Sequence, residues 1–492
     1  MRQTAGFLLL ALVAAPVQAA DVAVAPGTEP ELTIYNGDLG MVRERRIVKL
    51  VEGDNRLAFS GVSRNLQPET AALALTPIDK AKPADLRIFD QTFAFNLMSQ
   101  QSLLEQSIGK EVSFVTINPA NGREITERAK VLSVQDGLVV EIAGKIHTGV
   151  SPGRIVFDSL PPNLRATPTL LVSASGPAGV DIPVELSYLS GGLGWHADYV
   201  ADYDNDAGRL DLTGWATITN TTGVTFENAQ LKLAAGDINR AQPPQPPRPM
   251  MRMAMAAKAE ADQTMPEAQS LGGLNLYPIT RPVTLGTGET KQLALLRAIS
   301  VPVKRDYIVR GQSWFFTSLM PNQRQEGRTE IEVSLKNDRP ARPARGKAPA
   351  DPPTPADTSG LGAALPPGIV RAYGQDNDGA SQFLGEDRID HTAEGGEVRL
   401  RLGRDIDLPV VREQISFVRA SDQMLLSLWR ITVRNAKARA TSVRVVEPIP
   451  GSWEITKESL PHTKNAAGQA EWVLAIPAKG TASVEYTVRT TP

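Results

Sequence analysis

The sequence contains no cysteine. This absence excludes a disulfide framework, a thiolate metal site, a cysteine nucleophile and a lipid-modified N-terminal cysteine. No serine lies in a G-x-S-x-G motif, no H-E-x-x-H motif occurs, and no glycine-rich loop ends in Lys-Ser or Lys-Thr. Hydrolases, metalloproteases and nucleotide-binding enzymes therefore lack support, and we expect no catalytic, cofactor-binding or metal-binding residues.

Long apolar runs are almost absent as well. The one clear run covers residues 7–13, follows Arg2 and precedes the small residues Val17 and Ala19. This is the layout of a secretory signal peptide, and the run is shorter than the ~20 residues that span a bilayer. We expect cleavage after Ala19 or Ala20, a periplasmic location, and no transmembrane anchor in the mature chain.

The charge is close to balanced. The formal net charge is −2, and it becomes −3 when Arg2 is removed with the signal peptide. A balanced charge argues against nucleic acid as a partner, so we expect an unknown envelope protein or polymer instead.

Turn-forming residues, in contrast, are abundant. The chain has 40 Gly and 37 Pro but only 12 Phe, which favours many turns between short strands over long helices. A length of 492 residues suggests about three domains. The predicted class is mainly β, with several antiparallel sheets or β-sandwich modules and few short helices.

The pattern of strands and turns predicts the domain boundaries. We expect a signal peptide over 1–19, an N-terminal β domain over 21–180 and a C-terminal β domain over 181–492. Four short strand patterns predict a small barrel-like insert over 109–158, namely 110–117, 129–134, 138–142 and 154–157. Leu97, Leu104 and Ile108 lie at helical spacing before Gly109, which predicts one helix over 97–108.

Two Pro-rich tracts, 241–270 and 338–364, interrupt the C-terminal domain. Neither has the apolar periodicity that offsets the entropy cost of ordering, so both are predicted to be disordered. The first contains Met250, Met251, Met253 and Met255, whose thioethers are ligands for Cu(I). A flexible spacer has the same composition, and we prefer that interpretation for the methionines and for the adjacent Pro-rich run.

The segment from Leu365 to Leu408 carries the most specific pattern. Residues 376–379 read Asp-Asn-Asp-Gly between two extended runs, which predicts a β-hairpin. After Gly396, the alternation of 398–402 predicts a strand with Val398, Leu400 and Leu402 buried and Arg399 and Arg401 exposed.

These residues also carry a family resemblance. The chain resembles the mucoidy inhibitor A-like proteins, a secreted β-rich group with a C-terminal domain of unknown function, over roughly residues 180 to 492. The segments that match are 186–188, 194–199, 216–222, 231–236 and the hairpin ending at 385–391. The resemblance implies a fold and an envelope location and brings no catalytic residues, and the coiled coil that often separates the two domains of that family is missing here.

Several groups of residues are candidates for a site. Asp202 to Gly208 has alternating oxygen ligands, but the positions expected to hold Gly and Glu in a calcium loop are Ala207 and Thr213, so we interpret it as a hairpin turn. His196, His391 and His462 have no second histidine at ligand spacing, and a zinc site needs at least three converging ligands. Four aromatic residues form either a glycan platform or, more commonly at strand spacing, core: Trp195, Tyr199, Tyr203 and Trp215.

The sequence thus predicts a secreted, non-enzymatic β-rich envelope protein that acts by binding. Two alternatives stay open: an envelope glycan or polymer binding or processing protein, and copper buffering by the methionines.

Overall fold

Strands dominate the computed structural model, with 64% of residues in strands and 3% in helices, which confirms the mainly-β class. The structure describes residues 21–75, 86–118, 120–150, 154–161, 163–179, 181–236, 238–239, 269–271, 273–320, 322–338, 361–376, 378–421 and 424–491. The predicted signal peptide and the four clustered methionines lie outside these residues, as does most of each Pro-rich tract.

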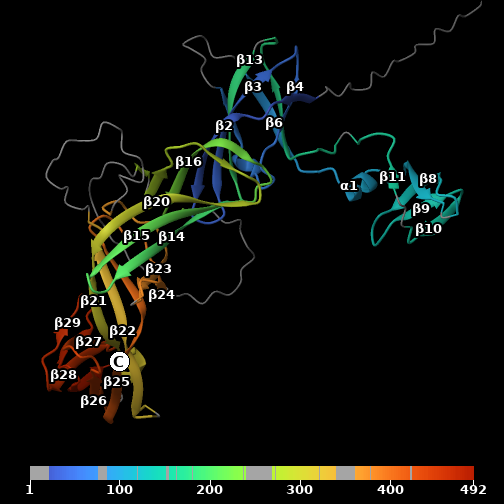
Figure 1. Cartoon of the computed structure of the whole chain (residues 1–492). Helices are drawn as coiled ribbons and strands as arrows, with labels where there is room; N and C mark the ends of the chain where they lie inside the picture. The colour runs from blue at the N-terminus through green and yellow to red at the C-terminus, as the bar shows by residue number, and fades with distance from the viewer. Residues whose placement is uncertain are drawn as a thin grey trace, which may run out of the picture. The chain divides into compact units, whose positions relative to one another are not determined.

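The chain forms two compact units, and it passes from one to the other several times. The first comprises residues 1–194, 219–233 and 278–290, and the second comprises 195–218, 234–277 and 291–492. Figure 1 shows the labelled strands and the helix of both units.

The first unit contains two sheets outside the insert. One has the order β1 (Asp21–Val24), β4 (Asn55–Ser60), β12 (Thr169–Ser175), β6 (Arg87–Ala94). The other includes, in order, β16 (Phe226–Ala235), β2 (Thr28–Tyr35), β3 (Gly40–Lys49), β13 (Asp181–Ser190), β5 (Ala72–Leu75), with β19 (Val283–Leu285) beside β16. A 3₁₀ turn, η1 (Pro68–Thr70), precedes β5.

The insert is an open sheet, so the predicted barrel-like shape is wrong. Its strand order is β10 (Lys145–Thr148), β9 (Val139–Ile142), β8 (Glu124–Ser133), β7 (Glu111–Ile117), β11 (Arg154–Val156). The edge strands β10 and β11 are at opposite ends of this order and do not pair. Val112, Phe114 and Val131 lie in a small core of its own, against which α1 packs Leu104.

The predicted helix exists but is shorter than expected. Helix α1 covers Gln100–Glu105, because the Ser99 hydroxyl accepts a hydrogen bond from the Ser102 amide and forms a capping box with it. Leu97, before the cap, forms an isolated bridge with Arg165 instead. Ile108, after the helix, is half exposed.

The second unit is built on two sheets and a short hairpin, β17 (Gln269–Leu271) with β18 (Leu274–Pro278). The smaller sheet has the order β20 (Glu289–Pro302), β15 (Arg209–Asn220), β14 (Leu193–Asp204), β23 (Gly368–Gln375), β24 (Ser381–Ile389). The larger has nine strands in the order β28 (Ser452–Glu458), β31 (Thr481–Thr491), β26 (Met424–Arg434), β25 (Glu397–Ser421), β22 (Arg324–Lys336), β21 (Lys304–Arg310), β27 (Thr441–Glu447), β30 (Ala470–Ile476), β29 (Thr463–Lys464).

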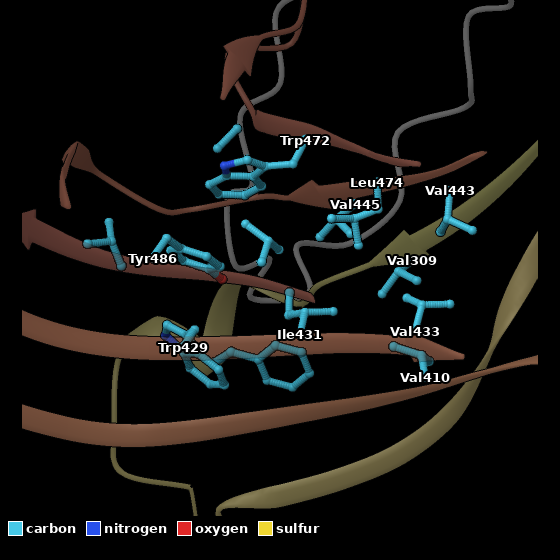
Figure 2. Close-up of a cluster of buried hydrophobic side chains, with 14 of the residues drawn as sticks. Val309, Val410, Trp429, Ile431, Val433, Val443, Val445, Trp472, Leu474 and Tyr486 are labelled. Atoms are coloured by element: carbon cyan, nitrogen blue, oxygen red, sulfur yellow. The ribbon is translucent and has the colours of Figure 1, made fainter. Parts of the chain in front are cut away.

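The nine-stranded sheet curls over one hydrophobic core. Trp472 of β30 stacks on Tyr486 of β31 with ring centroids 4.5 Å apart, although these strands are not neighbours in the sheet. Trp429 of β26 is fully buried in the same core (Figure 2). Its ring centroid is 5.6 Å from that of Phe316, in the 3₁₀ turn η2 (Ser313–Phe316). The two flanks of the sheet thus face each other as the layers of a sandwich do.

The hairpin of residues 368–389 has the predicted form. The Asp376 carboxylate accepts hydrogen bonds from the amides of Asp378 and Ala380, and Gly379 has a φ of +80°. A side chain at this φ would be strained, which explains the glycine.

The strand after this hairpin has the predicted faces: Val398, Leu400 and Leu402 are buried, while Arg399 and Arg401 are exposed.

We expect Leu400→Asp to lower the free energy of unfolding by several kcal/mol, because it buries an unpaired charge. Arg399→Ser should cost about 0.5 kcal/mol or less. Urea unfolding of both variants measures the difference. Equal costs would show that the register of β25 is different.

A buried ion pair crosses the same core. Arg412 of β25 donates to Glu447 of β27, and both side chains are almost fully buried. The Arg412 guanidinium lies over the ring of Phe315 at 5.0 Å. Burial raises the pKa of Glu447, and the charge of Arg412 opposes this increase.

Removal of one partner should be costly. Arg412→Ala leaves the Glu447 carboxyl buried without its counter-charge, and we expect the free energy of unfolding to fall by about 3–5 kcal/mol. The double variant Arg412→Met, Glu447→Leu fills the same space without charge and should recover most of the loss, as measured by urea unfolding. A double variant as unstable as Arg412→Ala would contradict this interpretation.

Candidate functional site

A charged cleft lies on one face of the nine-stranded sheet in the second unit. Its floor is formed by residues of β25, β22, β21, β27 and β30, and its volume is about 830 Å³. One wall is formed by Tyr203 at the end of β14 and by Asn205 and Gly208 in the turn between β14 and β15. Five basic and four acidic side chains line this cleft.

Strand alternation places these charges together. On β27, Val443 and Val445 belong to the hydrophobic core, so Ser442 and Arg444 face the cleft on the other side of the sheet. The same alternation on β22 buries Val333 and Leu335 and turns Glu332 and Ser334 toward the cleft. On β25 it exposes Glu397 and Arg399.

Ion pairs connect the floor across its strands. Arg444 donates two hydrogen bonds to the Glu471 carboxylate, from Nε at 2.9 Å and from Nη2 at 3.0 Å. Its Nη1 lies 3.2 Å from Asp306 Oδ2, and Lys304 Nζ is 2.9 Å from the same oxygen. The hydrogen bonds to Glu471 hold the pKa of Arg444 above its ordinary value.

A second group of pairs lies at the β25 end of the floor. Arg399 Nη2 donates to Glu397 Oε2 at 2.7 Å, and this hydrogen bond lowers the pKa of Glu397. Glu332 is held by Arg310, which also pairs with Glu330 at 3.1 Å.

The wall is joined to the floor through Arg305, which packs on a tyrosine. The guanidinium of Arg305 is 5.0 Å from the ring centroid of Tyr307 and donates to Asn205 in the turn. Lys437 Nζ is 4.6 Å from the centroid of the same ring and 2.8 Å from its hydroxyl. Tyr307 therefore already contacts two cations.

The charged side chains of the cleft differ in how far they are exposed to solvent. The side chains of Glu332, Glu471 and Asp306 are 7%, 14% and 17% exposed. Those of Lys304 and Arg399 are 71% and 60% exposed, whereas those of Arg305, Arg444 and Glu397 are 23%, 26% and 43% exposed. Most carboxylates thus lie beneath the tips of the cations, and the accessible charge is mainly positive.

The candidate residues predicted from sequence lie elsewhere. His196 is exposed and its Nε2 is 3.1 Å from Asp198 Oδ2 on the smaller sheet. The Nε2 atom of His391 is 2.6 Å from Asn275 Nδ2, and burial lowers the pKa of His391. His462 is 2.9 Å from Glu458. No group of three or more His, Asp or Glu residues placed to hold a metal ion occurs in the described part of the chain.

The loop that has some features of a calcium site is a turn, as predicted. It connects β14 and β15, and the Asp204 carboxylate accepts hydrogen bonds from the amides of Asp206 and Ala207. Its Asn205 and Gly208 line the cleft, a role that the sequence analysis did not predict.

The four aromatic residues do not form one platform. Trp195, Tyr199 and Tyr203 are buried, as expected of core residues at strand spacing. Trp215 is only partly buried. The alternative of a glycan platform built from all four is therefore wrong.

Sequence reasoning missed the cleft almost entirely. Of the charged residues that line the cleft, the sequence pattern predicts an exposed position for Arg399 alone. The sequence does indicate the outward face of two strands of the cleft floor, because polar or charged residues alternate with β-branched residues in 330–334 and 441–445. Alternation identifies an outward face, however, and not which strands lie next to one another.

The class of protein is now defined: a β-rich chain whose C-terminal unit has a sandwich-like core on one face of a sheet and a charged cleft on the other. Among the described residues, no helix has the length and hydropathy of a membrane span. The model of a domain of unknown function, DUF4139, matches residues 184–491, so the chain belongs to that family. No curated protein matches the chain.

Outside the cleft, the carboxylate of Asp198 is expected to stabilise the fold in a pH-dependent way. This carboxylate accepts from Thr217 Oγ1 at 2.7 Å and from Arg371 Nη1 at 3.0 Å. Burial acts to raise its pKa, but these bonds outweigh burial and hold it below the ordinary 3.8. A lowered carboxyl pKa stabilises the fold above that ordinary value, and the stabilisation is lost as the pH falls through the folded pKa.

We expect Asp198→Asn to lower the free energy of unfolding by about 1–2 kcal/mol at pH 7 and by less at pH 3. Asp202→Asn, an exposed change on the same strand, is the control. Urea unfolding at both pH values provides the comparison. A cost that does not depend on pH would contradict the assigned role of the carboxylate.

Proposed function

We propose that the chain is exported through its N-terminal segment and acts in the bacterial envelope as a mucoidy inhibitor A-like binding protein, without catalysis. The charged cleft is its ligand site. The apolar run after Arg2 supports export, and the hairpin and the other matching segments support the family assignment.

One observation carries this proposal: nine charged side chains are gathered around a single cavity of about 830 Å³. This volume is in the range of small-molecule sites. Exposed ion pairs contribute little to stability, typically about 0–1 kcal/mol each. A purely stabilising role therefore gives little reason to concentrate them on one concave face, whereas ligand recognition does.

The state of the carboxylates favours binding over catalysis. A general acid requires a carboxyl whose pKa is raised toward the working pH. In the cleft, Arg399 lowers the pKa of Glu397, and Glu471 and Asp306 both accept from Arg444. All three carboxylates thus accept hydrogen bonds from an arginine.

The test uses two variants with the same change in net charge. The cleft variant carries Lys304→Gln and Arg439→Gln, and the control carries Arg419→Gln and Lys457→Gln, two exposed positions outside the cleft. Mature protein from the periplasmic fraction, expected to begin at Ala20 or Asp21, is sedimented with isolated cell envelopes. We expect the wild type and the control to co-sediment and the cleft variant to bind about tenfold more weakly.

The envelope polymers are then recovered and sized. Unchanged polymer length is expected of a binding protein, and shortened polymer would show that the protein is an enzyme. Equal sedimentation of the cleft variant and the wild type would show that the cleft is not the ligand site.

A further inference from the structure

We infer that the ligand of the cleft is an acidic glycan, a saccharide chain whose carboxylates or phosphates lie against the exposed cations. This inference rests on the proposed function, because it assumes that the cleft is the ligand site. It adds the chemical class of the ligand.

The exposed fractions of the charged side chains in the cleft indicate whether its ligand is an anion or a cation. A ligand that enters the cleft meets the ammonium of Lys304 and the guanidinium of Arg399 first, because they are 71% and 60% exposed. Asp306 and Glu471 lie deeper and already accept hydrogen bonds from Arg444. An anion therefore meets two exposed cations, which also pair with Asp306 and Glu397, whereas the one well-exposed carboxylate that a cation would meet is Glu397, at 43%.

Arg439 provides a donor whose guanidinium is not engaged elsewhere. Its side chain is exposed at the mouth of the cleft, and no ion pair joins it to another residue in the described part of the chain. A guanidinium presents a planar set of N–H donors that matches a carboxylate or phosphate. Arg439 can accordingly bind an oxyanion without breaking an existing ion pair.

The floor is wide enough for several units of a chain. Five neighbouring strands form it, and adjacent strands are about 4.8 Å apart, so the floor is roughly 20 Å across. Cations occur along this direction, from Arg399 on β25 through Lys304 on β21 to Arg444 on β27. Such spacing suits a polymer with repeated anionic groups better than it suits one small ion.

The scarcity of free aromatic surface separates a glycan from other anionic polymers. Nucleic acid binding without sequence preference uses aromatic faces on which bases stack. Tyr203 is buried and Tyr307 already contacts Arg305 and Lys437, and these are the two aromatic residues of the lining. A protein partner is usually anchored by large side chains in an apolar pocket, whereas the apolar side chains of this lining are the small Val303, Ala440 and Val473 among nine charged ones.

The experiment measures binding of defined polymers to the mature full chain by isothermal titration calorimetry. Polygalacturonate and short-chain polyphosphate supply carboxylates and phosphates, and dextran is the neutral saccharide. Poly-glutamate and oligothymidylate represent acidic peptides and nucleic acids. Equal melting temperatures of wild type and variants are required first, so that changes in affinity are not caused by unfolding.

We expect polygalacturonate or polyphosphate to bind, with a Kd that rises at least tenfold in the cleft variant and stays unchanged in the control variant. Affinity should also fall as salt is added. The tighter of the two probes identifies the anionic group of the ligand.

Three results would overturn the inference. If dextran binds as tightly as polygalacturonate and the cleft variant loses both, the cleft is a ligand site but the ligand need not be acidic. If poly-glutamate or oligothymidylate binds more tightly than either acidic probe, the class of polymer is wrong. If the acidic probes do not bind, or bind the cleft variant as they bind the wild type, the anionic assignment fails; envelope sedimentation then decides whether the proposed function fails with it.

Discussion

The two faces of the nine-stranded sheet depend on a single constraint, the period-two alternation of side chains along each strand. On β27, Val443 and Val445 point into the core around Trp472, and Arg444 between them points into the cleft. A slip of one residue would exchange these faces and bury the guanidinium. The tightly packed core therefore fixes the register, and the register fixes which charged groups line the cleft. In this protein the stability of the core and the geometry of the candidate site cannot be varied independently.

The buried pair of Arg412 and Glu447 reinforces this register. It joins β25 to β27, two strands that are separated in the sheet by β22 and β21, across the interior of the unit. Gly311 lies directly over it, and a Cβ at that position would come within 1.8 Å of Glu447 Oε2. The carboxylate is thus enclosed by backbone on one side and by the guanidinium on another. A buried pair of this kind contributes little net stability but disfavours arrangements in which either charge loses its partner.

The sequence predicted those features that depend on local patterns. The faces of Val398 and Leu400, the turn at Gly379 and the hairpin turn at Asp204 follow from alternation and turn chemistry, and the structure confirms them. The helix was predicted too long because Ser99 caps it after Leu97, and the insert was predicted to close although its edge strands do not pair. The cleft could not be predicted, because it brings together residues from 203 to 473, and the strand order that does so arises from tertiary packing.

The central claim is that an anionic saccharide binds on the charged face of the sheet. The most direct measurement is a crystal structure of the mature chain with a galacturonate oligomer. We expect carboxylates of the oligomer within hydrogen-bond distance of Arg439 and Lys304, with the pairs of Arg444 to Glu471 and Asp306 intact. An oligomer that binds elsewhere on the molecule, or that reaches the cleft only by breaking those pairs, would contradict this claim.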